Sequence, residues 1–465
     1  MAKVMPASSL ARAFLILVIF TTSFDIFLVF HLGFTFRIAQ ILLTMPIGYV
    51  LFQAFRRSVA IWPLGFAPLL IWTFFMAIFI PNTDFPIRSV AYFIWLVYNA
   101  IMIFVVVQLF DDYRKALTVV RWYLYSFLFV ASFGIFQFIS PLLGLGAPLI
   151  VQWWATGSIS RVNGFSYEPS YFASYLIMGW VFTLYLLKNR STLISRGKLF
   201  LIAAVTSLAL LLSSSRAGIL TMIIWLAQYP LMLIWRVARG YVNKKLFMVT
   251  VALTMAFGFL AIIVSMIGVK ELQFLFAGIG LFGQAAHSLE SRTYRLEDTL
   301  AIFLQSPIIG YSLGGVSSAI GHYRGLEVTS LDLAKRNEGL CVFAEVLAAS
   351  GIVGVIPFAI YIFKIVLSPL RLAWKASDNN LKTILAGLVY SLIIELIILQ
   401  FNQNILRLYL WMHVAILSAV YSVGMSNSRK MMLVPLPMGA GSVKQAIADS
   451  RTEAVKDLAT ESGVG

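Results

Sequence analysis

The chain has 465 residues, of which 60% are hydrophobic and only 12% are charged. Soluble domains carry about 25% charged residues, so this composition excludes an ordinary soluble protein. The net charge of +16 is explained by the basic loops of membrane proteins and requires no nucleic-acid partner. The single cysteine, Cys341, excludes a disulfide framework and a cysteine metal cluster.

Apolar segments of about 18 residues or more predict membrane-spanning helices. We predict an all-α polytopic membrane helical bundle with about twelve transmembrane helices. The spans lie at about 11–30, 38–55, 61–80, 89–110, 119–139, 169–187, 199–214, 217–235, 246–267, 346–367, 383–400 and 408–423. We expect that the first is not a cleavable signal peptide, because it lacks a small-residue cleavage site and more spans follow.

The distribution of basic residues predicts which side of the membrane each segment faces. With both termini in the cytoplasm, 24 of the 35 Lys and Arg residues lie on that side and 11 lie outside, nine of them arginines. This imbalance favours cytoplasmic termini. We therefore expect a transmembrane domain at 1–423, with outer loops at about 140–168 and 268–345, and a cytoplasmic tail at 424–465.

The outer end of the sixth predicted span carries the first candidate site. Pro169 suits the first position of a helix, which puts Glu168 at the N-cap beside the exposed N–H groups of that end. Arg161, one loop upstream, can close on the same anion or on Glu168. Two interpretations remain: an anion site, or a carboxylate that caps the helix and pairs with Arg161.

A second candidate lies where the seventh and eighth predicted spans meet with almost no loop. The segment reads Ser213-Ser-Ser-Arg216-Ala-Gly218, so Arg216 is fixed at the outer membrane boundary. A guanidinium stays charged and binds phosphate through two hydrogen bonds, which predicts an anion-binding role. The alternative is an arginine at a helix end that only extends its head group toward water.

The large outer loop contains further candidates. Arg292 and Arg295 are three residues apart on a helix predicted at Glu290–Gln305, which Pro307 and Gly310 end. Both arginines therefore face one side of that helix. They either bind an anion there or form ordinary ion pairs on a solvated surface.

The end of this loop leads into the tenth predicted span. It contains Arg336, a candidate substrate-binding residue, and Glu338, a candidate base. His322, in the same loop, is a third candidate base, although a lone loop histidine is more often a surface residue.

Several of these segments together resemble one family. Arg161-Val-Asn-Gly-Phe…Glu168-Pro-Ser-Tyr-Phe-Ala, the serine-rich tip before Arg216, and Arg295…Pro307-Ile-Ile-Gly310 are similar to motifs of the polytopic O-antigen polymerase/ligase family. The resemblance covers about 160–365, and it is most specific around Glu168 and Arg216.

The resemblance implies a glycosyltransferase of the bacterial inner membrane, with undecaprenyl-pyrophosphate-linked glycans as donor and acceptor and with membrane lipids around it. It implies no metal, nucleotide sugar or other cofactor, and a chain-length regulator as the partner of a polymerase. Arg216, Arg292 and Arg295 would hold the donor pyrophosphate, where negative charge develops as it leaves. Arg161 and Glu168 would order the donor side of the pocket.

An acceptor sugar hydroxyl needs a base or an oriented acceptor. Glu168 and Glu338 are the first candidates for this role, and His322 is the third. Aromatic residues near the site can stack on sugar faces, or they belong to the aromatic belt at the membrane edge. These are Trp153, Trp154, Tyr167 and Tyr171.

One motif departs from the ligase pattern. Ligases of this family typically carry His-Asn before the tenth span, where this chain has Arg336-Asn337. The difference favours an O-antigen polymerase, with a ligase as the alternative. A lipid-linked glycan flippase is an alternative of another class. It predicts cations deep within many spans, whereas the span interiors of this chain are nearly free of them.

Four further carboxylates invite other interpretations. Asp25 and Glu395 fall within predicted spans, where each is either a relay group or a hydrogen-bonded structural residue. Asp111 and Asp112 are adjacent in sequence, as a metal pair can be, but we expect them in a solvated turn beside two basic residues.

Overall fold

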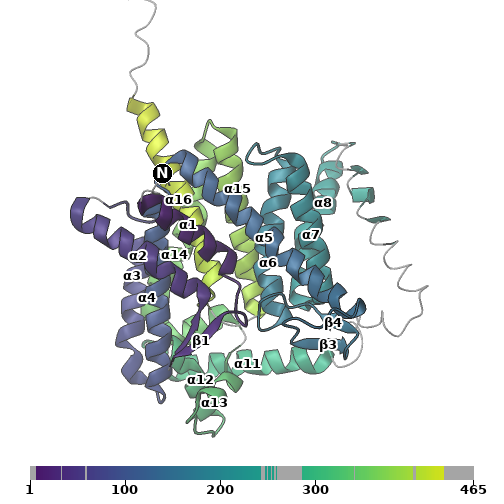
Figure 1. Ribbon diagram of the computed structural model, residues 1–465. Coiled ribbons are helices and arrows are strands. Elements are labelled where there is room, and N and C mark those ends of the chain that lie inside the picture. The colour runs from purple at the N-terminus through teal and green to yellow at the C-terminus, as the bar shows by residue number, and fades with distance from the viewer. Residues whose placement is uncertain are drawn as a thin grey trace, which may run out of the picture. The chain divides into compact units, whose positions relative to one another are not determined.

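The computed structural model describes residues 7–241 and 285–433, apart from positions 33, 58, 59, 340 and 402–404, together with scattered positions between 244 and 258. Its described segments are mostly helical (Figure 1), which confirms the predicted all-α bundle. The chain divides into two units, Met1–Val423 and Gly424–Gly465.

Nine helices of the described part are long and apolar enough to cross a membrane. They are α2 (Ile38–Arg57), α4 (Pro86–Leu109), α5 (Tyr113–Leu142), α6 (Pro169–Lys188), α7 (Arg196–Ser213), α8 (Arg216–Ala238), α14 (Val342–Lys375), α15 (Asn379–Ile398) and α16 (Leu408–Leu433). Two shorter apolar helices are α1 (Ala7–Thr21) and α3 (Phe66–Ile78). These helices match all the predicted spans except the one at 246–267, which lies mostly outside the described residues. The chain is a multi-pass membrane protein.

The start of several spans follows from local capping. Pro86 and Pro169 occupy the first positions of α4 and α6, where a missing N–H costs no hydrogen bond. The Asp112 side chain accepts a hydrogen bond from the Arg114 N–H at 2.9 Å and so caps α5. The expectation that Asp111 and Asp112 lie in a turn is therefore confirmed.

The first predicted span, 11–30, is wrong at its C-terminal end. The helix α1 ends at Thr21, and the chain then forms an antiparallel hairpin of β1 (Val29–Leu32) and β2 (Phe34–Arg37). Phenylalanine and β-branched residues in this segment suit strands, so hydropathy alone could not distinguish the hairpin from a continuing helix.

Asp25 is consequently not inside a span. It lies in the turn after α1, where Arg37 and Arg407 each approach one of its carboxylate oxygens at 3.0 Å. An ionised carboxylate in hydrocarbon is costly, and ending the helix before Asp25 brings it to these two cations instead.

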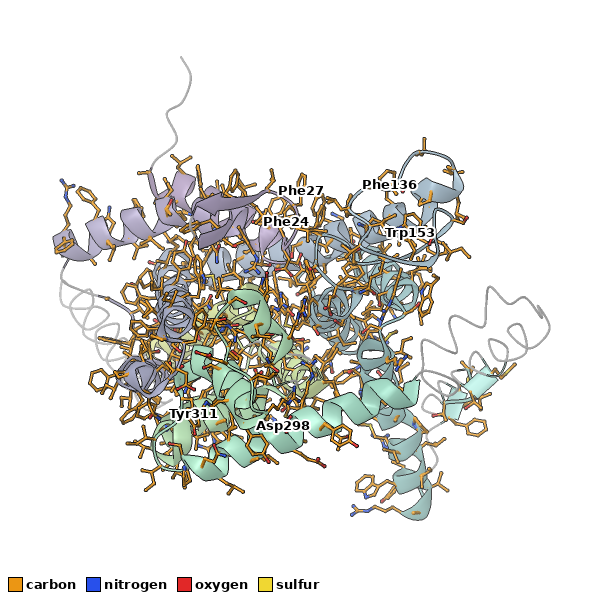
Figure 2. All side chains as sticks on the ribbon, turned by 90° about the horizontal axis from the view of Figure 1, so that it is seen from below. Phe24, Phe27, Phe136, Trp153, Asp298 and Tyr311 are labelled. Carbon is orange, nitrogen blue, oxygen red and sulfur yellow. The ribbon has the colours of Figure 1, made fainter. Side chains whose placement is uncertain are left out.

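The remaining described elements gather at one end of the bundle, together with the β1–β2 hairpin (Figure 1). They are the hairpin of β3 (Gln152–Ala155) and β4 (Ile159–Arg161), and the helices α11 (Ala285–Gln305), α12 (Ser312–Tyr323) and α13 (Leu331–Arg336). Two short 3-10 turns, η1 (Ile80–Asn82) and η2 (Leu399–Phe401), complete the described elements. The helix predicted at Glu290–Gln305 is confirmed as α11, which begins earlier and crosses this end of the bundle (Figure 2).

The centre of the bundle is formed by α6, α15 and α16. Their spanning windows are 78%, 72% and 83% buried, against 22% for α8, which therefore lies at the periphery. Glu395 of α15 is fully buried, as expected. His413 of α16 is also buried, with its Nδ1 2.8 Å from the Tyr123 hydroxyl.

The helix α14 bends at Gly351, whose φ of 55° and ψ of −173° are not helical. The Pro307-Ile-Ile-Gly310 segment fits against this bend. The Ile352 N–H donates to the Pro307 carbonyl at 2.8 Å, and the Tyr311 N–H donates to the Ala348 carbonyl at 3.1 Å. The bend thereby fixes the end of α11 to the bundle.

Candidate functional site

The α7–α8 turn and the β3–β4 hairpin meet at the end of the bundle that also holds α11, α12 and α13 (Figure 1). The α7–α8 turn is made by Ser214 in the left-handed region, with φ of 48°, and Ser215 then caps α8 by accepting the Gly218 N–H at 3.4 Å. The hairpin is joined to the turn through the Val162 N–H, which donates to the Leu212 carbonyl at 3.4 Å. Arg216, the first residue of α8, is therefore placed beside β4.

Arg161 lies on the C-terminal end of α7. Its Nε donates to the Ser213 carbonyl at 3.3 Å and its Nη2 to the Ser214 carbonyl at 3.4 Å. Its Nη1 donates to Gln152 Oε1 at 2.8 Å, and the guanidinium lies 5.5 Å from the centre of the Trp154 ring. A cation is favourable at the carbonyl end of a helix, and these contacts hold Arg161 in one orientation.

Glu168 occupies the N-cap position of α6, but its side chain accepts no hydrogen bond from the N–H groups of that helix. Its Oε2 instead accepts a hydrogen bond from the Ser170 hydroxyl at 2.9 Å. Within the described residues it forms no ion pair with Arg161. The alternative of a carboxylate that caps the helix and pairs with Arg161 is therefore not what the structure contains.

Arg161, Glu168 and Arg216 instead line one pocket, of about 190 Å³, together with Gln152, Ser170 and Ser215. All three charged side chains are half-buried. Burial lowers the pKa of Arg161, the neighbouring Arg216 lowers this pKa further, and Glu168 raises it. The like charges of the two arginines thus act on each other across the pocket. An anion placed there would relieve that repulsion. We call this site the arginine pocket.

A second cluster surrounds Glu338. Arg88, a buried residue of α4, pairs with the Glu338 carboxylate and donates to the Ser317 hydroxyl. Its Nη2 also donates to the Tyr92 hydroxyl at 2.8 Å, and that hydroxyl donates to Glu338 Oε1 at 3.3 Å. The Glu338 carboxylate is therefore already engaged by one guanidinium and one hydroxyl group.

Two more arginines, on α11 and at the end of α12, hold the same segment. Arg295 donates to the Glu338 carbonyl at 3.1 Å. Arg324 pairs with Asp298 of α11 (Figure 2) and donates to Asn337 Oδ1 at 3.3 Å. Burial lowers the pKa of Arg295, and the neighbouring Arg324 lowers it further. The Asn337–Glu338 segment is therefore fixed by arginines from α4, α11 and the end of α12.

A third cluster joins Asp25 and Arg37 to Arg407. The Arg407 guanidinium lies 3.5 Å from the centre of the Tyr171 ring, one turn of α6 after Glu168. Burial alone would lower the pKa of Arg407. Asp25 raises this pKa, and other groups that include Glu338 raise it by smaller amounts, so the net pKa is raised. Arg407 therefore contacts α6 one turn beyond Glu168 and is within electrostatic range of Glu338.

The structure brings some predicted site residues together and leaves others apart. Arg161, Glu168 and Arg216 share the arginine pocket, whereas Arg295 and Glu338 belong to the second cluster. Tyr171 is buried beneath Arg407. The exposed residues are Tyr167, His322 and Arg336, so no contact here fixes a catalytic or binding geometry for them. The side chain of Arg292 lies outside the described residues.

Sequence reasoning missed Arg37, Arg88 and Arg407 as members of these clusters. All three are among the nine arginines that the sequence analysis assigned to the outer side. The excess of arginine over lysine on that side was the sequence feature that could have identified them. Their carboxylate partners, Asp25 and Glu338, are distant in sequence from Arg407 and Arg88, so no local motif links them.

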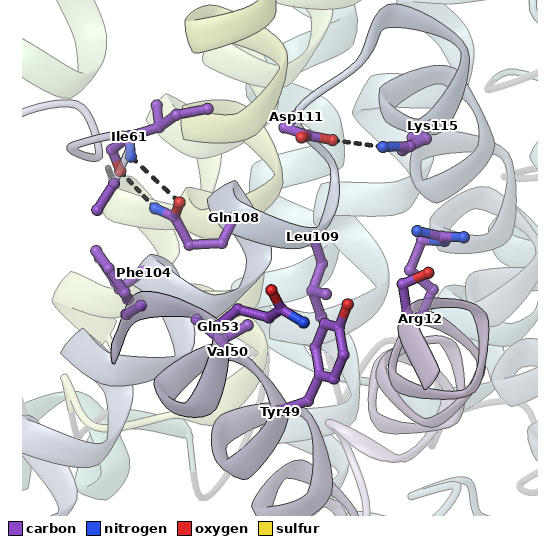
Figure 3. A pocket seen from close by; sticks show the side chains of 13 residues that line it. Arg12, Tyr49, Val50, Gln53, Ile61, Phe104, Gln108, Leu109, Asp111 and Lys115 are labelled. Atoms are coloured by element: carbon purple, nitrogen blue, oxygen red, sulfur yellow. Dashed lines mark hydrogen bonds and ion pairs between the residues drawn. The ribbon is translucent and has the colours of Figure 1, made fainter. Parts of the chain in front are cut away.

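No group of three or more His, Cys, Asp or Glu side chains that could hold a metal ion occurs among the described residues. A larger cavity, of about 440 Å³, lies at the opposite end of the bundle, between α1, α2 and the α4–α5 turn (Figure 3). It contains none of the predicted site residues.

Residues 199–359 match a protein-family model described as O-antigen ligase. This match supports the resemblance of the chain to the O-antigen polymerase/ligase family. The matched segment runs from α7 into α14, and so contains Arg216, Arg295 and Glu338. No curated protein matches the chain significantly. A match to this family implies glycosyltransferase-type enzyme activity in general, and it gives no support to a flippase.

Proposed function

We propose that the protein is an O-antigen or surface-polysaccharide polymerase, which joins oligosaccharide repeat units linked to undecaprenyl pyrophosphate. The arginine pocket is the observation that supports this proposal most directly. It combines two half-buried guanidinium groups with one carboxylate at the end of a spanning bundle, where a lipid-anchored anion can reach them. A guanidinium group binds phosphate through two parallel hydrogen bonds, so a pocket with two such groups suits a pyrophosphate head group.

The proposed chemistry uses these residues in distinct roles. The acceptor hydroxyl oxygen attacks the anomeric carbon of the donor sugar, and the bond from that carbon to the pyrophosphate oxygen breaks. The pyrophosphate leaves on its lipid, with its new charge stabilised by Arg161 and Arg216. The hydroxyl proton passes to the Glu168 carboxylate. Because Glu338 is paired with Arg88 and His322 is exposed, Glu168 is the preferred base.

The location follows from the same proposal. The polyprenyl-linked donor and acceptor are held in the bacterial inner membrane, and the arginine pocket faces the periplasm while both termini are cytoplasmic. The basic-residue distribution supports this orientation, with 24 of the 35 cations on the cytoplasmic side. Membrane lipids surround the bundle, and a chain-length regulator is the expected protein partner. No metal or cofactor takes part in the proposed transfer.

A ligase that transfers finished polysaccharide to lipid A-core is the second candidate, because the matched family model is described as O-antigen ligase. The Arg336-Asn337 sequence, where ligases typically carry His-Asn, favours the polymerase. Neither side chain can act as a base in the way that histidine does, because a guanidinium stays protonated and an amide does not titrate.

A deletion strain separates the two enzymes. Loss of a polymerase leaves surface lipid that carries a single repeat unit, whereas loss of a ligase leaves a bare core and long polymer on the lipid carrier. We expect the single repeat unit on gels of lipid-linked glycans. A bare core with long polymer on undecaprenyl pyrophosphate would instead identify a ligase.

Purified protein tests the donor directly. In lipid nanodiscs with undecaprenyl-pyrophosphate-linked repeat units alone, a polymerase lengthens the glycan, as mass spectrometry of the lipid products would detect. A ligase needs lipid A-core in the same mixture. Absence of transfer in both mixtures, with folded protein, would contradict the proposed lipid-linked donor.

A further inference from the structure

The cavity at the end of the bundle opposite the arginine pocket has a polar lining between spanning helices. Its volume is about 440 Å³, and Figure 3 shows side chains from α1, α2 and the α4–α5 turn around it. Gln108 closes one side, because its amide bonds both the N–H and the carbonyl of Ile61, at 3.2 Å and 2.6 Å. These two hydrogen bonds hold the segment before α3 against the end of α4 and so maintain the wall of the cavity.

The charge of this lining is positive. Lys115 pairs with Asp111 at 2.6 Å, which leaves that carboxylate engaged. Arg12 donates to the Ser9 hydroxyl at 3.0 Å and forms no ion pair within the described residues. Tyr49 and Gln53 add a hydroxyl and an amide to the same lining (Figure 3). Two cations and one carboxylate, with neutral hydrogen-bonding groups beside them, suit an anion such as a phosphodiester.

The surroundings of the cavity are apolar and exposed. Phe55 is 91% exposed, Trp62 is 65% exposed and Phe52 is 53% exposed, all within one or two turns of lining residues. The Arg56 guanidinium lies over the Phe52 ring at 4.6 Å. Aromatic and basic side chains of this kind are typical of the membrane–water interface. An amphiphile could therefore place its polar part in the cavity and its apolar part against the exposed aromatic side chains around the opening.

We propose that this cavity binds the head group of an anionic phospholipid, in the leaflet opposite the arginine pocket. Arg12 and Lys115 hold the phosphodiester, Tyr49 and Gln53 hydrogen-bond its oxygens, and the acyl chains lie along the exposed aromatic rim. Basic pockets between spanning helices bind anionic head groups in this manner. A soluble anion would bind the two cations but would make no contact with the exposed aromatic rim. This proposal is independent of the proposed transferase function.

The test uses the full-length protein in a neutral detergent with phosphatidylglycerol as the probe and native mass spectrometry as the readout. The Arg12→Gln/Lys115→Gln variant is expected to lose at least about fivefold in phosphatidylglycerol affinity, since each cation near a membrane surface contributes about fivefold. The matched control is Arg196→Gln/Lys198→Gln, which removes two cations from the first turn of α7, outside the cavity. It should stay within about twofold of the parent.

A second variant guards against a folding defect. Ala54 lines the cavity and is exposed on α2, so Ala54→Trp blocks the cavity without removing a charge. It should lose phosphatidylglycerol binding and keep the thermal stability of the parent. Phosphatidylcholine should bind no better to the parent than to either variant.

Three results would overturn the proposal. These are full phosphatidylglycerol binding by either cavity variant, an equal loss in the α7 control, and competition by millimolar inorganic phosphate. The last would identify a soluble phosphate site in place of a lipid site.

Discussion

Arg161 and Arg216 owe their proposed roles to properties that lysine lacks. A guanidinium remains charged beside another cation and presents paired donors in a plane, whereas an ammonium is a point charge with a flexible stem. In the arginine pocket, Arg161 is held by two backbone carbonyls and Gln152, so its remaining donor directions are fixed before any anion arrives. Fixed donors stabilise developing charge without reorganisation.

Arg216→Lys should lower the transfer rate at least about tenfold while the protein still inserts and folds, because the paired donors are lost and the charge is kept. The measurement is the initial rate of glycan extension in nanodiscs. Arg196→Lys is the matched control, since Arg196 is the first residue of α7 and lies at the opposite end of that helix from the pocket. Near-normal extension by Arg216→Lys would identify Arg216 as a membrane-edge anchor.

Glu168→Gln tests the proposed base. The amide keeps the size of the side chain and can still accept the Ser170 hydrogen bond, so folding should be unaffected. The maximal rate is expected to fall by about a hundredfold, with little change in the donor concentration needed for half-maximal rate. Glu327→Gln, in the outer loop, is the control and should behave as the parent. A change confined to donor affinity would show that Glu168 only orders the pocket.

At the level of single residues, the sequence was sufficient to predict neighbours where adjacent helices place two residues at the same end of the bundle. Glu168 and Arg216 both begin spans whose N-terminal ends face the same side, so their proximity could be anticipated. The partners of Arg88 and Arg407 could not be predicted from the sequence. Glu338 lies 250 residues from Arg88 and Asp25 lies 382 residues from Arg407, and only the tertiary fold brings these charges together.

Among the elements, α4 is joined through charge to the segment between α13 and α14. The Arg88 and Glu338 side chains are only 6% and 14% exposed, so each charge interacts with the other in place of the hydrating water that burial removes. Removing one partner of a buried pair leaves the other charge uncompensated, which costs more than removing both.

Arg88→Met should therefore reduce the free energy of unfolding by about 3–5 kcal/mol, and Arg88→Met/Glu338→Gln should reduce it by clearly less. Detergent-titrated unfolding followed by tryptophan fluorescence provides the measurement. Lys335→Met, which removes the exposed partner of Asp332, should cause no detectable change. Equal losses in the single and double variants would argue against a stabilising pair.

The bend in α14 is a second element-level feature. A Cβ on Gly351 would lie 2.3 Å from the Ile308 carbonyl oxygen, and the residue has a positive φ. Gly351→Ala is expected to lose about 3 kcal/mol of stability or more, since strain and a backbone clash act together. Gly197→Ala, in open space on α7, should be neutral or slightly stabilising. Thermal unfolding of both variants in the same detergent compares them.

The elements also show where hydropathy fails. It found α4 to α8 and α14 to α16 because long apolar helices have few alternatives in a membrane. It could not find the end of α1, because the following hairpin is equally apolar. Nor could it foresee that the Pro307–Gly310 turn docks on the bend at Gly351, since that contact depends on a carbonyl left available by the bend.

For the whole molecule, the orientation in the membrane decides which end can meet a lipid-linked glycan. Reporter fusions at residues 190, 240, 375 and 450 should be cytoplasmic, and fusions at 155 and 320 should be external, because most basic residues flank the first group. Activity of paired reporters at each position provides the measurement. An external reporter at residue 240 would overturn the span count and move Arg216 to the cytoplasmic side.

The tight turn between α7 and α8 links the arginine pocket to the thickness of the bilayer. The helix α7 has 18 residues and therefore a length of about 27 Å, slightly less than a typical hydrocarbon core of about 30 Å. With no loop to absorb a mismatch, a thicker membrane would draw Arg216 below the lipid head groups or thin the lipid around it. The acyl-chain length of the host membrane thus becomes a variable that sets how far the pocket stands from the head groups of its substrates.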